Sequence, residues 1–252
     1  MRKALSLEFY KLRRKYVLPM ALLFLTVELV WALIAVSMSF ERNRDSAGWE
    51  VIVAMLSTMN GLFLPLLSAI VVSRICDMEH KGNTWRLLRS MAVQPGKLYA
   101  AKYACAGLIM LGVCLCQVLA IAVFGVQSGY LTSVPLVLLA RFLFGTLVTT
   151  LVVLALQQWI STVVKNQAFA LCLGMLGGFL GMVGDLFPEA ARRVFVWAYY
   201  TGLSPVTQQY ASEKMQFVVR EAGPISSAAA VLLAVAALLF LMGRRHASRL
   251  EG

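Results

Sequence analysis

The polar or charged side chains of the long apolar stretches include Glu28, Asn60, Gln117, Arg141 and Asp185, the candidates for chemistry within the membrane. An ionised carboxylate at the centre of a bilayer costs roughly 2.5–3.5 kcal/mol on insertion scales. Glu28 must therefore face the protein interior or water, or be protonated, and Asn60 and Gln117 are uncharged residues that could pair with it. We expect a polar site within the membrane, with either a role in a substrate path or a role in packing.

Arg141 and Asp185 form a second candidate pair. Arg141 falls about two helical turns into one apolar stretch, and Asp185 falls near the outer end of the next stretch. Their similar depth predicts an ion pair. The substrate-path candidates are therefore Glu28, Asn60, Arg141 and Asp185. A chain of acids suited to relaying protons is missing from the apolar stretches.

The sequence contains no recognisable enzyme motif. A P-loop of the form GxxxxGK[ST] is absent, as are HExxH and GxSxG, so we expect no ATPase, metalloprotease or hydrolase site in this chain. The five cysteines form no CxxC pair and no cluster with histidine, which argues against a disulfide framework or a zinc site. The prediction is a non-catalytic chain without a cofactor of its own.

The composition is that of a membrane protein. The 252 residues are 60% hydrophobic and only 14% charged, whereas soluble domains have about 45–50% apolar and about 25% charged residues. Six stretches have about the 20 apolar residues needed to span a bilayer. They are 17–40, 51–73, 103–126, 135–160, 168–187 and 225–242. We predict an all-α, polytopic fold with a single transmembrane domain over residues 1–252.

The distribution of Lys and Arg predicts the orientation. With the N-terminus in the cytoplasm, the inside segments 1–16, 74–102, 161–167 and 243–252 hold 16 basic residues, and the outside segments hold 6. The positive-inside rule selects this arrangement, with both termini cytoplasmic. The net charge of +11 is thereby explained without nucleic acid.

Residues 1–16 have the pattern of an amphipathic helix in the cytoplasmic interface. Leu5, Phe9, Leu12 and Tyr16 fall on one face at helical spacing. Glu8, Lys11 and Lys15 fall on another face. The alternative is a plain basic flank that sets the topology.

The longest predicted cytoplasmic loop, residues 74–102, contains a short amphipathic pattern. Gly82 and Asn83 break the helical pattern, and Asn83 is a possible N-cap. The residues on one face of the helix that follows are Thr84, Leu87, Leu88 and Met91. Gln94-Pro95-Gly96 ends that helix, and Pro95 is suited to the first position of the next one. Because this helix would expose a small apolar face to the cytoplasm, we predict that another protein binds it.

Two other segments carry structural signals. Residues 188–224 are too polar to span, and their aromatic cluster, Phe195, Trp197, Tyr199 and Tyr200, predicts short helices at the outer membrane surface. The stretch 168–187 contains two GxxxG pairs, Gly174/Gly178 and Gly177/Gly181, which let helix backbones approach closely. Packing inside one subunit is favoured over a subunit interface for these glycines.

Residues 77–88, which read DMEHKGNTWRLL, resemble the loop after the second span of ABC-2 export permeases. That family has an acid, then Gly and Thr, a leucine pair, and a Pro followed by two basic residues, matched here by Pro95, Lys97 and Lys102. The sequence Asn-Thr-Trp at residues 83–85 and the sequence EFYKLR at residues 8–13 are most similar to those of permease subunits of lantibiotic-immunity ABC transporters. One departure is Asn83, which separates a Gly and a Thr that the broader family usually has adjacent.

The resemblance implies a permease whose short loop helix seats in a groove of a separate cytoplasmic ABC ATPase, which would bind ATP and Mg²⁺. A second permease subunit, identical or different, would complete the transporter in a bacterial plasma membrane. The substrate would be an amphipathic antimicrobial peptide. The coupling residues implied by the resemblance are Asp77, Glu79, Gly82, Thr84, Trp85, Leu87, Leu88 and Pro95.

Two other functions compete with this one. A channel or an ion-coupled transporter would be expected to show half-repeats, broken helices and a buried ion site. The sequence offers only Glu28 as a candidate for such a site, and it shows no convincing repeat. A non-transporting membrane subunit that assembles a complex is the other. Copurification of an ATPase would separate the exporter from both.

Overall fold

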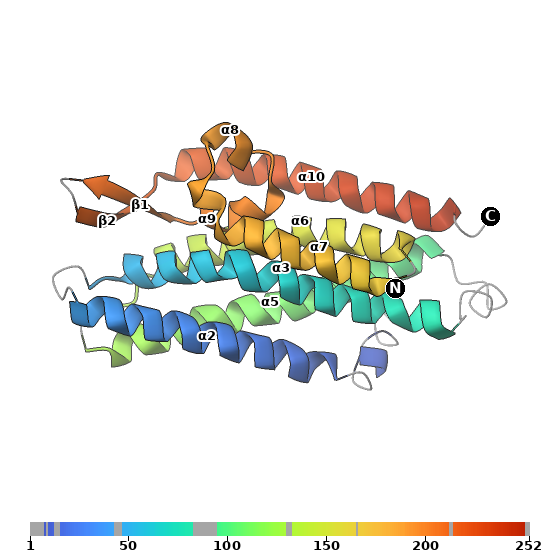
Figure 1. Cartoon of the computed structure of the whole chain (residues 1–252), viewed down its shortest axis with the longest axis horizontal. Coiled ribbons are helices and arrows are strands. Elements are labelled where there is room, and N and C mark those ends of the chain that lie inside the picture. The colour runs from blue at the N-terminus through green and yellow to red at the C-terminus, as the bar shows by residue number, and fades with distance from the viewer. Residues whose placement is uncertain are drawn as a thin grey trace.

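The computed structural model describes residues 8, 10–12, 16–42, 47–82, 95–129, 133–164, 166–211 and 214–249. The helices of a bundle lie side by side along the long axis of the molecule (Figure 1). They are α2 (Val17–Arg42), α3 (Trp49–Gly82), α5 (Pro95–Gln127), α6 (Leu136–Val163), α7 (Gln167–Met182) and α10 (Ala222–Arg249). The start of α2 and the end of α10 lie at one end of the bundle, here called the terminal end, and a β-hairpin marks the opposite, hairpin end (Figure 1).

Five of these helices are long and apolar enough to cross a membrane, namely α2, α3, α5, α6 and α10. The helix α7 has 16 residues, and at about 1.5 Å per residue its length of about 24 Å is shorter than a hydrocarbon core of about 30 Å. The prediction of a multi-pass helical protein is confirmed. The sixth crossing stays a prediction.

The helices extend further than hydropathy predicted. The helix α3 continues to Gly82, nine residues past the predicted span 51–73, and α5 begins at Pro95, eight residues before the predicted span 103–126. The interior backbone bonds of a helix are satisfied in water as well as in lipid, so a helix need not end where the hydrocarbon ends. Pro95 occupies the first helical position, as predicted. Helix therefore covers both ends of the predicted loop 74–102, and residues 83–94 lie outside the described residues.

The helix α3 forms the centre of the bundle, between α2, α6 and α7. In its most apolar part 67% of the residues are buried, compared with 28% in α2 and 22% in α10. The exposed faces of the outer helices are nevertheless apolar, with Leu22 and Trp31 on α2 and Leu238 on α10 more than half exposed. Helices that are apolar on all sides are suited to lipid contact.

The glycines of α7 allow it to pack directly on α3. Gly174, Gly178 and Gly181 are all buried. A Cβ atom on Gly178 would lie 2.7 Å from the backbone oxygen of Leu62, and one on Gly181 would overlap the backbone oxygen of Gly61. These GxxxG glycines therefore serve packing within one chain, as the favoured interpretation predicted.

The segment between α7 and α10 lies at the hairpin end and is only partly as predicted. It contains the short helices η2 (Gly184–Leu186), α8 (Glu189–Arg192), η3 (Val196–Ala198) and α9 (Tyr199–Gly202), which confirm the expectation of short helices. It continues as an antiparallel hairpin of β1 (Val206–Ala211) and β2 (Lys214–Val219), in register from Val206 opposite Val219 to Ala211 opposite Lys214. The all-α prediction is therefore wrong for this segment. An open strand edge is tolerated there because water can satisfy it, unlike in the hydrocarbon core.

Candidate functional site

A buried polar cluster joins three helices in the middle of the bundle. Glu28 on α2, Asn60 on α3 and Gln117 on α5 are each at most 1% exposed. The Gln117 side-chain nitrogen donates to a Glu28 carboxyl oxygen at 2.9 Å and to the Asn60 side-chain oxygen at 2.7 Å. Gln117 pairs with Glu28 as expected, and Asn60 joins the cluster through its hydrogen bond with Gln117.

Three atoms of this cluster have no hydrogen-bond partner among the described residues. They are the second carboxyl oxygen of Glu28, the side-chain nitrogen of Asn60 and the side-chain oxygen of Gln117. An amide nitrogen has only two hydrogens, so Gln117 has no further donor for Glu28. Because the cluster is closed to solvent in this conformation, it can link α2, α3 and α5 but does not line an open path. A substrate role for Glu28 and Asn60 stays a prediction.

A buried ion pair lies at the terminal end of the bundle. The Lys102 ammonium on α5 is 3.2 Å from the Glu8 carboxylate and donates to the backbone oxygen of Ile75 on α3 at 3.0 Å. Glu8 also pairs with Lys11 at 3.0 Å. Lys102 therefore ties the N-terminal segment to both helices that bracket residues 83–94.

This ion pair corrects the predicted placement of Glu8, whereas the interfacial helix of residues 1–16 stays a prediction. Glu8 was expected on the polar face of that helix, but it is 1% exposed. Helical spacing alone assigned Glu8 to the polar face, whereas Lys102, distant in sequence, draws it into the protein. Tyr16 has a positive φ of 53°, so the chain turns there before α2 begins. Leu12 is buried, but against the protein core.

The residues implied for ATPase coupling are described only in part. Asp77, Glu79 and Gly82 belong to the last turns of α3, and Pro95 starts α5. Thr84, Trp85, Leu87 and Leu88 lie outside the described residues. The described part places the two ends of this segment at the terminal end of the bundle (Figure 1).

The predicted Arg141–Asp185 ion pair is wrong. The Arg141 guanidinium donates to the backbone oxygen of Arg220 at 2.6 Å, just after the hairpin. Asp185 instead accepts from Arg192 at 3.2 Å and from the Thr201 hydroxyl at 2.9 Å. Asp185 lies in η2, past the end of α7, because the predicted span 168–187 ends as a helix at Met182.

Arg220 organises the hairpin end and was not predicted from the sequence. Its guanidinium donates to the backbone oxygens of Thr201 and Gly202 at 3.3 and 2.7 Å and to the Thr207 hydroxyl at 2.9 Å. Its backbone nitrogen donates to Pro205. Burial lowers the pKa of Arg220, and the nearby positive charge of Arg192 lowers it further. Its only sequence signal is its place directly before the apolar stretch 225–242.

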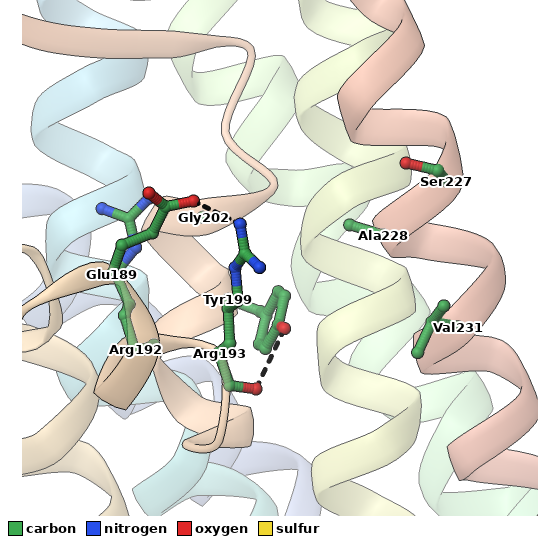
Figure 2. Close-up of a pocket in the computed structure, with 9 residues that line it drawn as sticks. Glu189, Arg192, Arg193, Tyr199, Gly202, Ser227, Ala228 and Val231 are labelled. Carbon is green, nitrogen blue, oxygen red and sulfur yellow. Dashed lines mark hydrogen bonds and ion pairs between the residues drawn. The ribbon is translucent and has the colours of Figure 1, made fainter.

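A hollow of about 450 Å³ lies beside this network, between the short helices and α10. Figure 2 shows Glu189, Arg192, Arg193 and Tyr199 on one side and α10 on the other. Arg193 pairs with Glu189 at 2.6 Å, and the Tyr199 hydroxyl donates to the Arg193 backbone oxygen at 3.1 Å. The remaining lining residues include Gly202 and, from α10, Ser227, Ala228 and Val231.

The five long apolar helices define a multi-pass membrane protein. The sequence model described as ABC-2 family transporter protein matches residues 4–181. The match covers more than half of the chain, and the chain therefore belongs to the ABC-2 transporter family. A search of the curated proteins finds no match.

Membership in this family has direct consequences. ABC-2 proteins are membrane permease subunits, generally non-catalytic, and the family implies partnership with an ABC ATPase subunit. The matched part contains α2, α3, α5, α6 and nearly all of α7. The short helices, the hairpin, the hollow and α10 lie beyond it.

Proposed function

We propose that this chain is the membrane subunit of an ATP-driven exporter that expels a lantibiotic-like antimicrobial peptide from the membrane and so confers immunity or resistance. The observation that supports it most is the ABC-2 family match over residues 4–181. The choice of substrate is supported by residues 77–88, whose sequence resembles the corresponding loop of lantibiotic-immunity permeases. In this proposal the substrate is amphipathic and enters from the outer leaflet.

The proposed orientation places the terminal end in the cytoplasm and the hairpin end outside. It is supported by the excess of basic residues in the segments that meet at the terminal end. In this orientation α6 ends at the terminal end, and α10 begins at the hairpin end and runs back to the terminal end (Figure 1). The proposed sixth crossing is therefore made by α7, which connects the end of α6 to the hairpin end. The shortness of α7 is compensated by η2 and the following short helices, which continue the chain at the hairpin end.

Coupling would pass through residues 83–94. The apolar side chains of Trp85, Leu87 and Leu88 would dock into the ATPase, and α3 and α5 would carry the resulting movement into the bundle. The buried pair Glu8–Lys102 supports this path, because Lys102 also bonds the Ile75 backbone oxygen on α3. A second permease subunit, the same chain or another, would complete the transporter.

A peptide-tolerance assay tests this function. The chain is coexpressed with the ABC ATPase that copurifies with it in a lantibiotic-sensitive bacterium, and the inhibitory peptide concentration is measured. We expect protection that is lost in the double variant Leu87→Asp/Leu88→Asp, because two carboxylates cannot enter an apolar groove without a large desolvation cost. The variant Leu87→Met/Leu88→Met keeps the face apolar and should protect fully. Full protection by the aspartate variant would refute the docking role, and no protection by the wild type would refute the peptide substrate.

A further inference from the structure

Two hollows at the hairpin end lie beside α10 and share part of their lining. The second hollow, of about 390 Å³, is lined by Arg192, Gly202, Arg220, Glu221 and Ile225. It shares Arg192 and Gly202 with the hollow of Figure 2. Both lie beyond residue 181, where the family match ends, so the family assigns them no role.

Two guanidiniums and one carboxylate line the second hollow, and the carboxylate of Asp185 acts on both arginines. The guanidiniums are those of Arg192 and Arg220, and the lining carboxylate is that of Glu221. Arg220 makes no ion pair within the part of the chain that the structure describes, since its printed partners are two backbone oxygens and a hydroxyl. Arg192 pairs with Asp185 at 3.2 Å, a carboxylate that also accepts from Thr201. Arg220 is therefore the less neutralised of the two positive charges that an added anion would meet, since Asp185 pairs with Arg192 and acts on Arg220 without a printed ion pair.

The position of the Arg220 guanidinium is fixed before any ligand binds. Its three hydrogen bonds hold it against α9 and β1, and Arg141 holds its backbone oxygen at 2.6 Å. Guanidinium groups are suited to phosphate because their planar arrangement of donors matches phosphate oxygens. A preorganised guanidinium loses less conformational entropy when it binds.

The wall formed by α10 is apolar and leads into the membrane. The candidate span of α10 begins at Ile225, which lines the second hollow, and Ala228 and Val231 line the first. Below them, Leu238 and Met242 follow Val231 at helical spacing, and all three are exposed. A ligand with a polar head in the hollow can thus extend an apolar tail along α10.

We propose that this site binds the headgroup of an anionic glycerophospholipid of the outer leaflet, such as phosphatidylglycerol. The phosphate lies between Arg192 and Arg220, Glu221 accepts from the headgroup hydroxyls, and an acyl chain follows α10. This goes beyond peptide export, because binding requires neither the ATPase nor the peptide, and only the choice of leaflet rests on the proposed orientation. The same phosphate chemistry would also accept free phosphate, so the test separates the two.

Native mass spectrometry of the purified chain tests the proposal. Dioleoyl phosphatidylglycerol, dioleoyl phosphatidylcholine and inorganic phosphate are added separately, and the affinity of the first bound ligand is measured. We expect phosphatidylglycerol to bind best. Arg192→Gln should weaken its binding by roughly tenfold or more, the value of one charge-assisted hydrogen bond.

The matched control is Arg42→Gln, which removes the same charge at the same end of the bundle but outside the hollows, and it should bind as the wild type does. Arg192→Lys keeps the charge and should retain most of the affinity, which separates charge from a folding defect in Arg192→Gln. Equal affinity for phosphatidylglycerol and phosphatidylcholine would overturn the proposal. So would equal losses in both glutamine variants. Binding of inorganic phosphate as tight as that of phosphatidylglycerol would assign the site to free phosphate instead.

Discussion

Replacing Gly178 with alanine should push α7 away from α3. The new Cβ atom would lie 2.7 Å from the Leu62 backbone oxygen, whereas ordinary van der Waals contact begins at 3.4 Å. The backbone oxygen belongs to a helix and cannot rotate away, so the two helices must separate by several tenths of an ångström. Overpacking of this kind costs about 1–3 kcal/mol. For a chain of this size, 1 kcal/mol lowers the melting temperature by about 2–4 °C.

Gly112 on α5 provides the control, because a Cβ atom there meets nothing within 4 Å. Both Gly→Ala changes gain the same helix propensity, up to about 1 kcal/mol, so the difference between the variants isolates the packing cost. Thermal unfolding of the purified protein in detergent, followed by tryptophan fluorescence, should place Gly178→Ala roughly 2–12 °C below Gly112→Ala. Equal melting temperatures would refute direct packing of α7 on α3.

Three other predictions concern the buried polar contacts. Glu8→Ala or Lys102→Ala alone should destabilise the protein by about 1.5–3 kcal/mol in chemical denaturation, because each removes a charge-assisted hydrogen bond between buried groups; if the double variant loses the sum of the two, the two side chains are not coupled. Gln117→Leu should cost about 2–3 kcal/mol in the same assay by removing two hydrogen bonds, and a cost near zero would contradict the cluster. Glu28→Gln keeps an oxygen for Gln117 and should fold normally, with peptide tolerance as its readout; unchanged tolerance would reduce Glu28 to a packing residue.

The helical bundle was predictable because a backbone that spans lipid must satisfy its own hydrogen bonds, which an α-helix does. Hydropathy located the helices, and the rule that polar side chains in hydrocarbon need partners brought Glu28, Asn60 and Gln117 together correctly. The ends of α3 and α5 were misplaced, since hydropathy marks where the membrane ends and a helix can continue beyond it.

The errors occurred where the partner was a backbone atom or was distant in sequence. Arg141 bonds the backbone oxygen of Arg220, an acceptor that exists only because the hairpin ends there. Glu8 lies opposite Lys102, 94 residues away in sequence, which helical periodicity within 16 residues cannot reveal. The hairpin had a weak signal in its β-branched and aromatic residues, such as Thr207 and Phe217, but polar residues between them masked it.

The most direct test of the proposed coupling is a photocrosslink from position 88. The photoreactive residue benzoylphenylalanine replaces Leu88, and intact cells that also express the ABC ATPase are irradiated. We expect one adduct that contains both this chain and the ATPase, and we expect position 88 to be inaccessible to reagents added outside the cell. Labelling of position 88 from outside, or irradiation that yields no ATPase adduct, would contradict the proposed coupling.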